Sequence, residues 1–318
     1  MPQPTPSQVH VNGPLTNISV AYIQSADAFV ASKVFPVVPV GKQSDLYYIY
    51  TKNDWFRDEA ERRAPATESA GSGYGLSTAS YDAKVWAFHK DVPDQVRENA
   101  DVMIQPDADA TRFVTQRLML RREVQWAADY FQASVWGTDV TPANLWSDYT
   151  NSDPISDVRL GVKTILSTTG FKPNKLTLGY DVFQKLQDHP DIIDRLKYTG
   201  GTTRAVTKEQ LAALFDIEEV LVCEAIKATN VEGETAAMAF VHGKHALLCH
   251  CAMSPSLLTP SCGYIFEWRG VSYGMGKAIG IKKFRMELLA ADRIEGQIAF
   301  DDKVVATDLG YFFANVVA

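Results

Sequence analysis

The segments LYYIYT (Leu46–Thr51) and YDAKVWAFHK (Tyr81–Lys90) are rich in aromatic and β-branched residues, which is typical of β-strands. The stretch between them, from Lys52 to Ser80, is polar and contains a mixed charge run, RDEAERR, and a glycine run, GSGYG. A connection of this length is uncommon inside a compact domain. The pattern therefore predicts a long two-stranded arm that projects from the body of the protein.

The first 45 residues contain few charges and six prolines, which block helices and central strands. A short helix is predicted near Ser25–Lys33. The apolar residues between Val30 and Val40 need burial. The sequence leaves two alternatives open: an extended arm that buries them against another molecule, or an arm that packs on its own domain.

A long helix is predicted to begin at Pro106 and Asp107 and to run to about Trp136. One apolar stripe recurs at steps of three, four and seven residues: Phe113, Leu120, Val124, Ala128, Phe131 and Val135. A helix of roughly 30 residues is about 45 Å long, which exceeds the usual length in a compact domain. Four arginines lie mostly off the stripe: Arg112, Arg117, Arg121 and Arg122.

From Asp153 onward, helix and strand signals alternate. Asp153 and Pro154 predict the start of a helix that ends at Gly170, and Thr207 with Gln210 has the sequence of a capping box. Strands are predicted at Lys175–Gly179, Glu219–Ala225 and Tyr264–Trp268, with AMAFV and ALLCHC as a hairpin. The chain from Ile279 to Val317 reads as strands with a turn at Asp301–Asp302. These elements together give an α+β fold class.

The composition excludes several classes of protein. The chain has 318 residues, of which 46% are hydrophobic, so it is neither disordered nor fibrous. Its net charge of −7 is unlike that of a dedicated nucleic-acid binder. Four cysteines do not form a disulfide scaffold, and no apolar run approaches the ~20 residues of a membrane span. We expect a soluble protein that makes no contact with a membrane.

Few residues are arranged as in a catalytic or metal site. The segment HGKHALLCHC places His242, His245, Cys249 and Cys251 close together, and zinc prefers such ligands. However, Cys249 and Cys251 are spaced too tightly for a zinc knuckle, and buried strand residues explain them better. YGMGKA lacks the spacing of a phosphate-binding loop, and His189 lies between two helices where Asp191 makes a good cap. We therefore expect no catalytic residue, no metal and no cofactor.

The order of these parts resembles the major capsid protein of tailed bacteriophages, which has the Hong-Kong-type capsid fold. LAALFDIEEVLVCEAI (Leu211–Ile226) resembles the family's helix-to-strand stretch, and GKHALLCH followed by PSLLTPSCGYIFEWRG (Pro255–Gly270) resembles strands of its apical domain. The resemblance implies an N-terminal arm (1–45), an extended E-loop hairpin (46–92), a peripheral domain with the spine helix (93–150), an apical domain (151–268) and strands that return to the peripheral domain (269–318).

The resemblance also implies a function. The chain would assemble with copies of itself, as pentamers and hexamers, into an icosahedral shell around double-stranded DNA. It would work with a separate scaffolding protein, a portal and a decoration protein, in the host cytoplasm and then in the virion. The alternating charges of the projecting arm are candidate intersubunit contacts: Arg57, Asp58, Glu59, Glu61, Arg62 and Arg63. The helix arginines named above are candidates for weak contacts between the inner surface and DNA phosphates.

Three other functions stay open. An encapsulin, which is a nanocompartment shell protein, would have the same fold. A zinc-dependent enzyme would use His242, His245, Cys249 and Cys251. A monomeric binding module would remain a small species at all concentrations.

Overall fold

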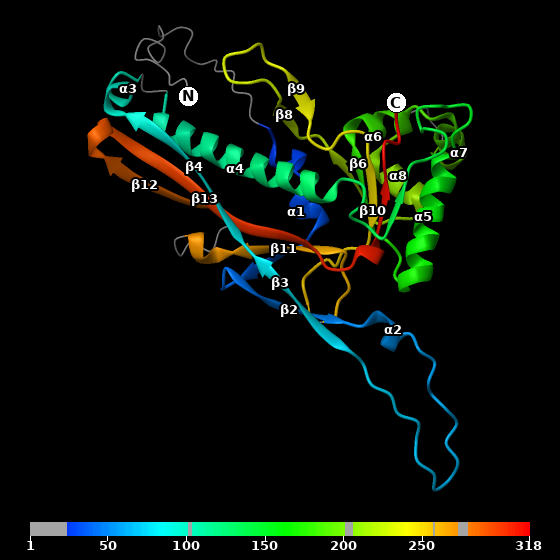
Figure 1. Cartoon of the computed structure of the whole chain (residues 1–318). Coiled ribbons are helices and arrows are strands. Elements are labelled where there is room, and N and C mark those ends of the chain that lie inside the picture. Colours follow the sequence, from blue (N-terminus) through cyan, green and yellow to red (C-terminus); the bar gives the residue numbers. More distant parts are fainter. Residues whose placement is uncertain (1–23, 101–103, 201–205, 257, 273–278) are drawn as a thin grey trace.

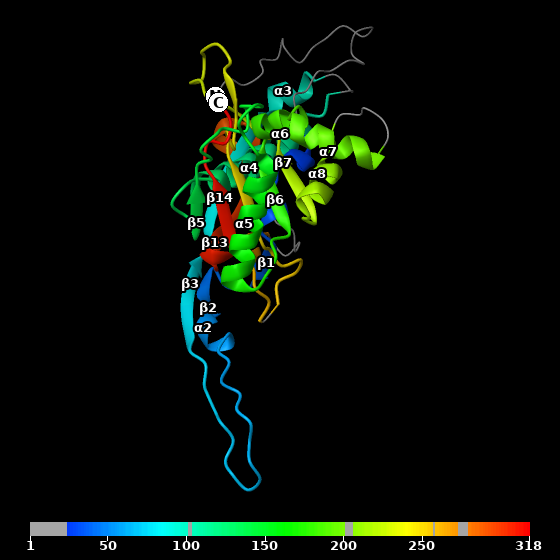
Figure 2. The same cartoon turned by 90° about the vertical axis from the view of Figure 1, so that its right-hand side faces the viewer.

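The computed structural model describes residues 24–100, 104–200, 206–256, 258–272 and 279–318. These residues form a body built on two five-stranded sheets, from which one long hairpin extends (Figures 1 and 2). The α+β class predicted from the sequence is confirmed. Within the described ranges, no helix has the length and apolar character that crossing a membrane requires.

The first sheet is organised around one long strand, β13 (Ala291–Val304). Strands β12 (Gly280–Met286) and β4 (Lys84–Pro93) pair with its first part from opposite sides. Its last residues pair with β11 (Gly263–Trp268), which also pairs with β1 (Val37–Val40). The predicted turn at Asp301–Asp302 is wrong, because β13 needs these residues to reach β11 after leaving β12.

Helix α4 (Pro106–Tyr130) lies along this sheet (Figure 1). It ends before Trp136, which folds back so that its Nε1 donates to the carbonyl of Tyr130 at 2.8 Å. The predicted apolar stripe is largely wrong, since Phe113 is 36% exposed and Ala128 is exposed. The buried face is Ala110, Val114, Leu118, Glu123, Trp126 and Ala127. This face contains the charged residue Glu123, so an analysis by hydropathy did not identify it.

The second sheet has the order β5 (Thr138–Val140), β14 (Gly310–Phe313), β10 (Ala246–Cys249), β6 (Lys175–Gly179) and β7 (Glu219–Cys223). Strand β10 is buried on both faces, so it takes the centre of the sheet. The predicted hairpin with AMAFV is therefore wrong: β9 (Met238–Phe240) pairs instead with β8 (Ile226–Ala228). The final strand, β14, also lies here and not beside β12 and β13.

Four helices pack around the second sheet (Figure 2): α5 (Pro154–Thr169), α6 (Tyr180–Gln187), α7 (Pro190–Gly200) and α8 (Lys208–Phe215). The predicted ends of α5 and the predicted capping box of α8 are confirmed. Asp153 caps α5 by accepting from the Ser156 amide, and Gly170 ends it with a φ of 75°. Thr207 and Gln210 form the capping box of α8.

The projecting arm is confirmed as a hairpin of β2 (Ser44–Tyr50) and β3 (Leu76–Asp82). A short helix, α2 (Lys52–Trp55), follows β2, and the chain then forms an open loop far from the body (Figures 1 and 2). After one buried residue, Ala83, β3 continues into β4. The hairpin is therefore a direct extension of the first sheet.

Part of the N-terminal stretch packs on its own chain, around helix α1 (Ala31–Val34). Val30, Val34 and Phe35 are buried, and the ring of Phe35 contacts Trp126 and Tyr130 with centroids 5.6 and 5.5 Å apart. For these residues the second of the two alternatives is correct. Residues 1–23 of the predicted arm lie outside the described residues.

Candidate assembly interface

The base of the hairpin is fixed to the body. The ring of Phe266 on β11 stacks on Tyr81 and Tyr47, with centroid distances of 4.5 and 5.4 Å. The backbone amide of Asp82 donates to Asp301 at 2.8 Å, and Lys52 forms an ion pair with Asp308. These contacts set the direction in which the hairpin projects.

The end of the hairpin makes no such contacts. Residues 55–74 are exposed throughout, including the whole predicted charge run. Arg57 lies 3.6 Å from carboxylates of both Asp54 and Glu59, which are loose surface pairs that contribute little. Four charged residues of the run form no ion pair with any residue that the structure describes: Asp58, Glu61, Arg62 and Arg63, of which Arg63 donates to the Thr67 carbonyl. Their charges are available to another molecule.

Exposed aromatic rings surround the start of this loop. Trp55 and Tyr74 are 54% and 63% exposed, and their rings lie 5.6 Å apart at the level of α2. Tyr50 joins them at 6.2 Å from Trp55. The sequence predicted strands here but not this exposure. The density of aromatic residues in LYYIY could have indicated this exposure, because a two-stranded hairpin is too thin to bury both of its faces.

An apolar groove of about 850 Å³ runs between the hairpin base and the loop that precedes β11. Tyr48, Tyr50, Phe171, Leu258 and Tyr264 are among its lining residues. Tyr48 and Leu258 are each more than half exposed. Contiguous exposed apolar surface of this kind is typical of a protein–protein contact.

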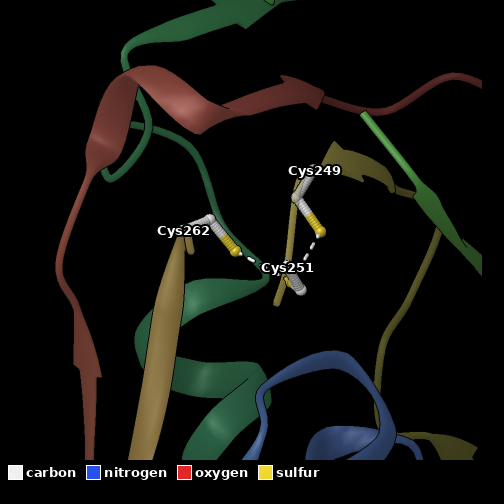
Figure 3. A group of neighbouring side chains, drawn as sticks. All are labelled: Cys249, Cys251 and Cys262. Carbon is white, nitrogen blue, oxygen red and sulfur yellow. Dashed lines mark hydrogen bonds between the residues drawn. The ribbon is translucent and has the colours of Figure 1, made fainter. Parts of the chain in front are cut away.

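The His and Cys residues that a zinc enzyme would use do not lie together in the structure. The sulfur atoms of Cys249 and Cys251 lie close together, and that of Cys262 joins them (Figure 3). His242 instead lies beside Glu123, and the His245 ring packs between Phe131 and Phe312. These four residues therefore do not form the ligand set that the alternative of a zinc enzyme requires.

His189 has a structural role in place of acid–base catalysis. It is fully buried, its Nε2 lies 3.0 Å from the Ser152 hydroxyl, and burial lowers its pKa. Asp191 is 3.9 Å from its other ring nitrogen. The glycine segment YGMGKA lies wholly outside the described residues.

Comparison with known proteins identifies the family to which this arrangement belongs. The chain is 26% identical over 312 residues to the major capsid protein of Burkholderia phage BcepMu, with 95% of both chains covered. It is 25% identical over 320 residues to the major capsid protein of Pseudomonas phage JBD67, with 96% of both covered. No protein-family model matches the sequence.

Solved structures agree in fold. A phage-related protein from Bordetella bronchiseptica RB50 superposes with a TM-score of 0.69 and 22% identity, over 92% of this chain and 93% of the other. The capsid structure of cyanophage P-SCSP1u gives a TM-score of 0.64 at 10% identity, over 96% and 93%. The chain is a phage capsid protein with the Hong-Kong-type fold.

Its role is structural, because both curated relatives are named as capsid proteins and not as enzymes. The fold is shared more widely. The encapsulin SrpI of Synechococcus elongatus PCC 7942 superposes on the capsid protein with a TM-score of 0.56 at 10% identity, over 95% and 94% of the two chains. At that identity the comparison concerns the fold alone, and the relatives with higher identity are phage proteins.

The four arginines of α4 in the capsid protein lie in different surroundings. Arg112 is exposed and 3.7 Å from Asp109, and Arg117 lies over the Phe113 ring. Arg121 lies 4.1 Å from the centre of the Trp86 ring. Arg122 reaches Ser32 at 3.4 Å, so it is partly engaged within the chain. Arg112 and Arg117 are the two that are exposed.

Proposed function

We propose that this capsid protein assembles through its hairpin into an icosahedral shell of pentamers and hexamers that encloses double-stranded DNA. The observation that carries the proposal is a hairpin with a fixed base and an end, residues 57–74, that is exposed throughout and forms only loose ion pairs within the hairpin. Each subunit then both donates a hairpin and receives one. Many weak copies of a single contact can close a shell under these conditions.

The exposed groups of the hairpin match such a contact. Rings at its start, such as Trp55 and Tyr74, gain burial when a neighbouring subunit covers them. The charges of Asp58, Glu61 and Arg62 then pair with that neighbour. Apolar area supplies affinity, and charge complementarity fixes the register between subunits.

We infer the domain division from the two sheets. The arm (1–45) and the E-loop hairpin (46–92) serve contacts between subunits. The peripheral domain (93–150 and 269–318) is centred on the first sheet with α4, and the apical domain (151–268) on the second. Five strands cross these chain boundaries, because β1, β4 and β11 belong to the first sheet and β5 and β14 belong to the second.

Charge reversal of Asp58, Glu59 and Glu61 to Lys tests the hairpin contact. We expect a folded chain that no longer forms shells in negative-stain electron microscopy, with circular dichroism like the parent. The matched control reverses Asp188, Glu218 and Glu234, which are exposed carboxylates of the body, and makes the same change in net charge. Shells of normal size from the hairpin variant, or loss of shells in both variants, would contradict the proposal.

The contents of purified particles test whether the shell encloses DNA. Nuclease-resistant double-stranded DNA inside them supports the phage role, whereas a protein cargo without DNA favours a nanocompartment. Replacing the exposed Arg112 and Arg117 with Gln should lower the salt concentration at which DNA is released, since weak phosphate contacts depend on ionic strength.

A scaffolding protein, a portal and a decoration protein are the partners that we propose for assembly in the host cytoplasm.

A further inference from the structure

The sulfur atoms of three cysteines meet inside the protein, one at the end of a strand and two in the segments that flank strands. Cys249 ends β10, Cys251 follows it, and Cys262 immediately precedes β11 (Figure 3). The Sγ atoms of Cys249 and Cys251 are 3.6 Å apart, those of Cys251 and Cys262 are 3.1 Å apart, and all three lie within 4.8 Å of one another. Each residue is at most 1% exposed.

The backbone around the three thiols is tightly held. Asn174, itself 7% exposed, accepts from the Cys251 amide at 2.9 Å and donates to its carbonyl at 2.8 Å. The Cys262 amide donates to the carbonyl of His250 at 2.8 Å. The three thiols therefore lie close together because the backbone segments that carry Cys251 and Cys262 are held in place, and not through side-chain rotation alone. Preorganisation of this kind is what a metal site requires.

The spacing suits a bound ion. A metal–sulfur bond of about 2.3 Å places the sulfurs of one site about 3.8–4.0 Å apart. The observed separations of 3.1 and 3.6 Å are reached from that value by shifts below about 1 Å. We propose that Cys249, Cys251 and Cys262 form a three-thiolate site for a soft monovalent ion, Cu(I).

The number of ligands decides between metals. Thiolates select soft ions such as Cu(I) and Zn²⁺, and structural zinc takes four ligands. The described residues offer three here, because His250 directs its Nδ1 to the Lys172 carbonyl at 2.7 Å and lies outside the group. A trigonal set of thiolates is a common environment for Cu(I). The ion enters as Cu(I), each thiol releases its proton to solvent, and no electron is transferred.

The site links two parts of the molecule. Cys249 belongs to the second sheet, whereas Cys262 leads into the first. A bound ion would therefore join the two sheets where the chain passes between them. This inference goes beyond shell assembly and does not depend on it, since an unassembled chain contains all three ligands.

The test uses the full chain, purified and reduced under anaerobic conditions, with Cu(I) added as its acetonitrile complex. After gel filtration we expect one copper per chain and a sulfur-to-copper absorption band in the ultraviolet. Cys251→Ala and Cys262→Ala should each lose both signals. The control is Cys223→Ala, a fully buried cysteine outside the cluster, which should keep them.

Four results would overturn the site: no retained copper, copper retained in the Cys251 and Cys262 variants, loss in the Cys223 variant alone, or one zinc per chain that Cu(I) does not displace. A Cys251–Cys262 disulfide in the purified protein would overturn it as well. If a variant fails to fold, as judged by circular dichroism, X-ray absorption of the copper-loaded parent decides the question. Three sulfur ligands support the site, and any other count contradicts it.

Discussion

Glu123 lies in the buried face of α4 with its Oε1 3.1 Å from Nε2 of His242, and both side chains are 1% exposed. The two groups are within ion-pair distance but lack the alignment of a hydrogen bond. Glu123 also accepts from the backbone amides of Val30 and Ala31, at 2.9 and 3.0 Å. One carboxylate therefore joins α4, the start of α1 and the segment after β9.

Removing this carboxylate should destabilise the fold strongly. Glu123→Ala leaves two buried backbone amides without acceptors, at about 1–3 kcal/mol each, so we expect a loss of about 3–5 kcal/mol. Urea denaturation of the unassembled chain measures it. Glu123→Gln should cost less, because its amide oxygen can still accept from one of the two amides.

A double-mutant cycle with His242→Gln then isolates the pair. We expect a coupling free energy of about 1 kcal/mol or more between Glu123→Gln and His242→Gln, since the two side chains are in contact. Strict additivity of the two changes would show that Glu123 acts through the amides of Val30 and Ala31 alone.

The stability of the protein should fall as pH rises toward 8, because of Asp302. Burial raises the pKa of this carboxyl to about 8, and neither of its oxygens has a hydrogen-bond partner in the described structure. Arg122 opposes the shift, whereas Asp301, Asp129 and Glu123 add to it. Between pH 4 and 8 the native state holds the proton and the unfolded state has lost it, so unfolding releases a proton and stability declines.

Asp302→Asn removes this titration. We expect the variant to have a flatter profile of unfolding free energy against pH, with a difference of up to about 5 kcal/mol across the window at about 1.4 kcal/mol per pKa unit. Denaturation at pH 5, 6.5 and 8 measures the profile. The control is Asp301→Asn, which should keep the slope of the parent. Parallel profiles for the parent and Asp302→Asn would contradict the prediction.

Close packing of α4 on β13 depends on Gly296. A Cβ at this position would lie 2.5 Å from Val114 Cγ1 and 2.8 Å from Leu118 Cδ1. Valine is stiff at χ1, so Gly296→Ala should force the helix away at a cost of about 1–3 kcal/mol. Thermal denaturation should show partial recovery when Val114→Ala is added. Gly41→Ala, with no atom within 4 Å of the added carbon, should be nearly neutral.

Local signals in the sequence identified much of the fold. Asp153, Gly170 and the Thr207–Gln210 pair mark helix ends through contacts between near neighbours, and these were confirmed. The projecting hairpin also followed from local composition, since a long polar segment between two strands cannot be buried.

Features that depend on contacts between distant residues were missed. β14 pairs with β10, and Cys262 meets Cys249 and Cys251, through contacts between residues that are far apart in the chain. The burial of Glu123 was missed because a charged side chain is not expected in a buried face. Hydropathy placed α4 on the wrong face because its buried side contains Glu123 and faces a glycine at position 296. Neither feature has a local signal.

Acid should weaken the far end of the first sheet, where the carboxylates of Asp94, Asp107 and Asp292 share the cations Arg97, Lys283 and Arg285. Asp292 lies within 3.4 Å of Arg97, Lys283 and Arg285, and Arg285 binds both oxygens of Asp94 at 2.6 Å. Hydrogen bonds from Arg285 and Lys283 lower the pKa values of Asp94 and Asp292, respectively. These contributions are present above the unfolded pKa of about 4 and are lost as pH falls through the lower native values.

Arg285→Gln therefore lowers the urea midpoint at pH 7 and reduces the further loss between pH 5 and pH 2, because fewer protons are taken up on unfolding. Salt should produce a similar decrease in the parent, since the network is largely exposed. The control, Lys208→Gln, breaks an isolated exposed pair with Glu224 and should change the midpoint little. Equal effects of the two substitutions would show that the charges around Asp292 act as separate surface pairs and not as a network.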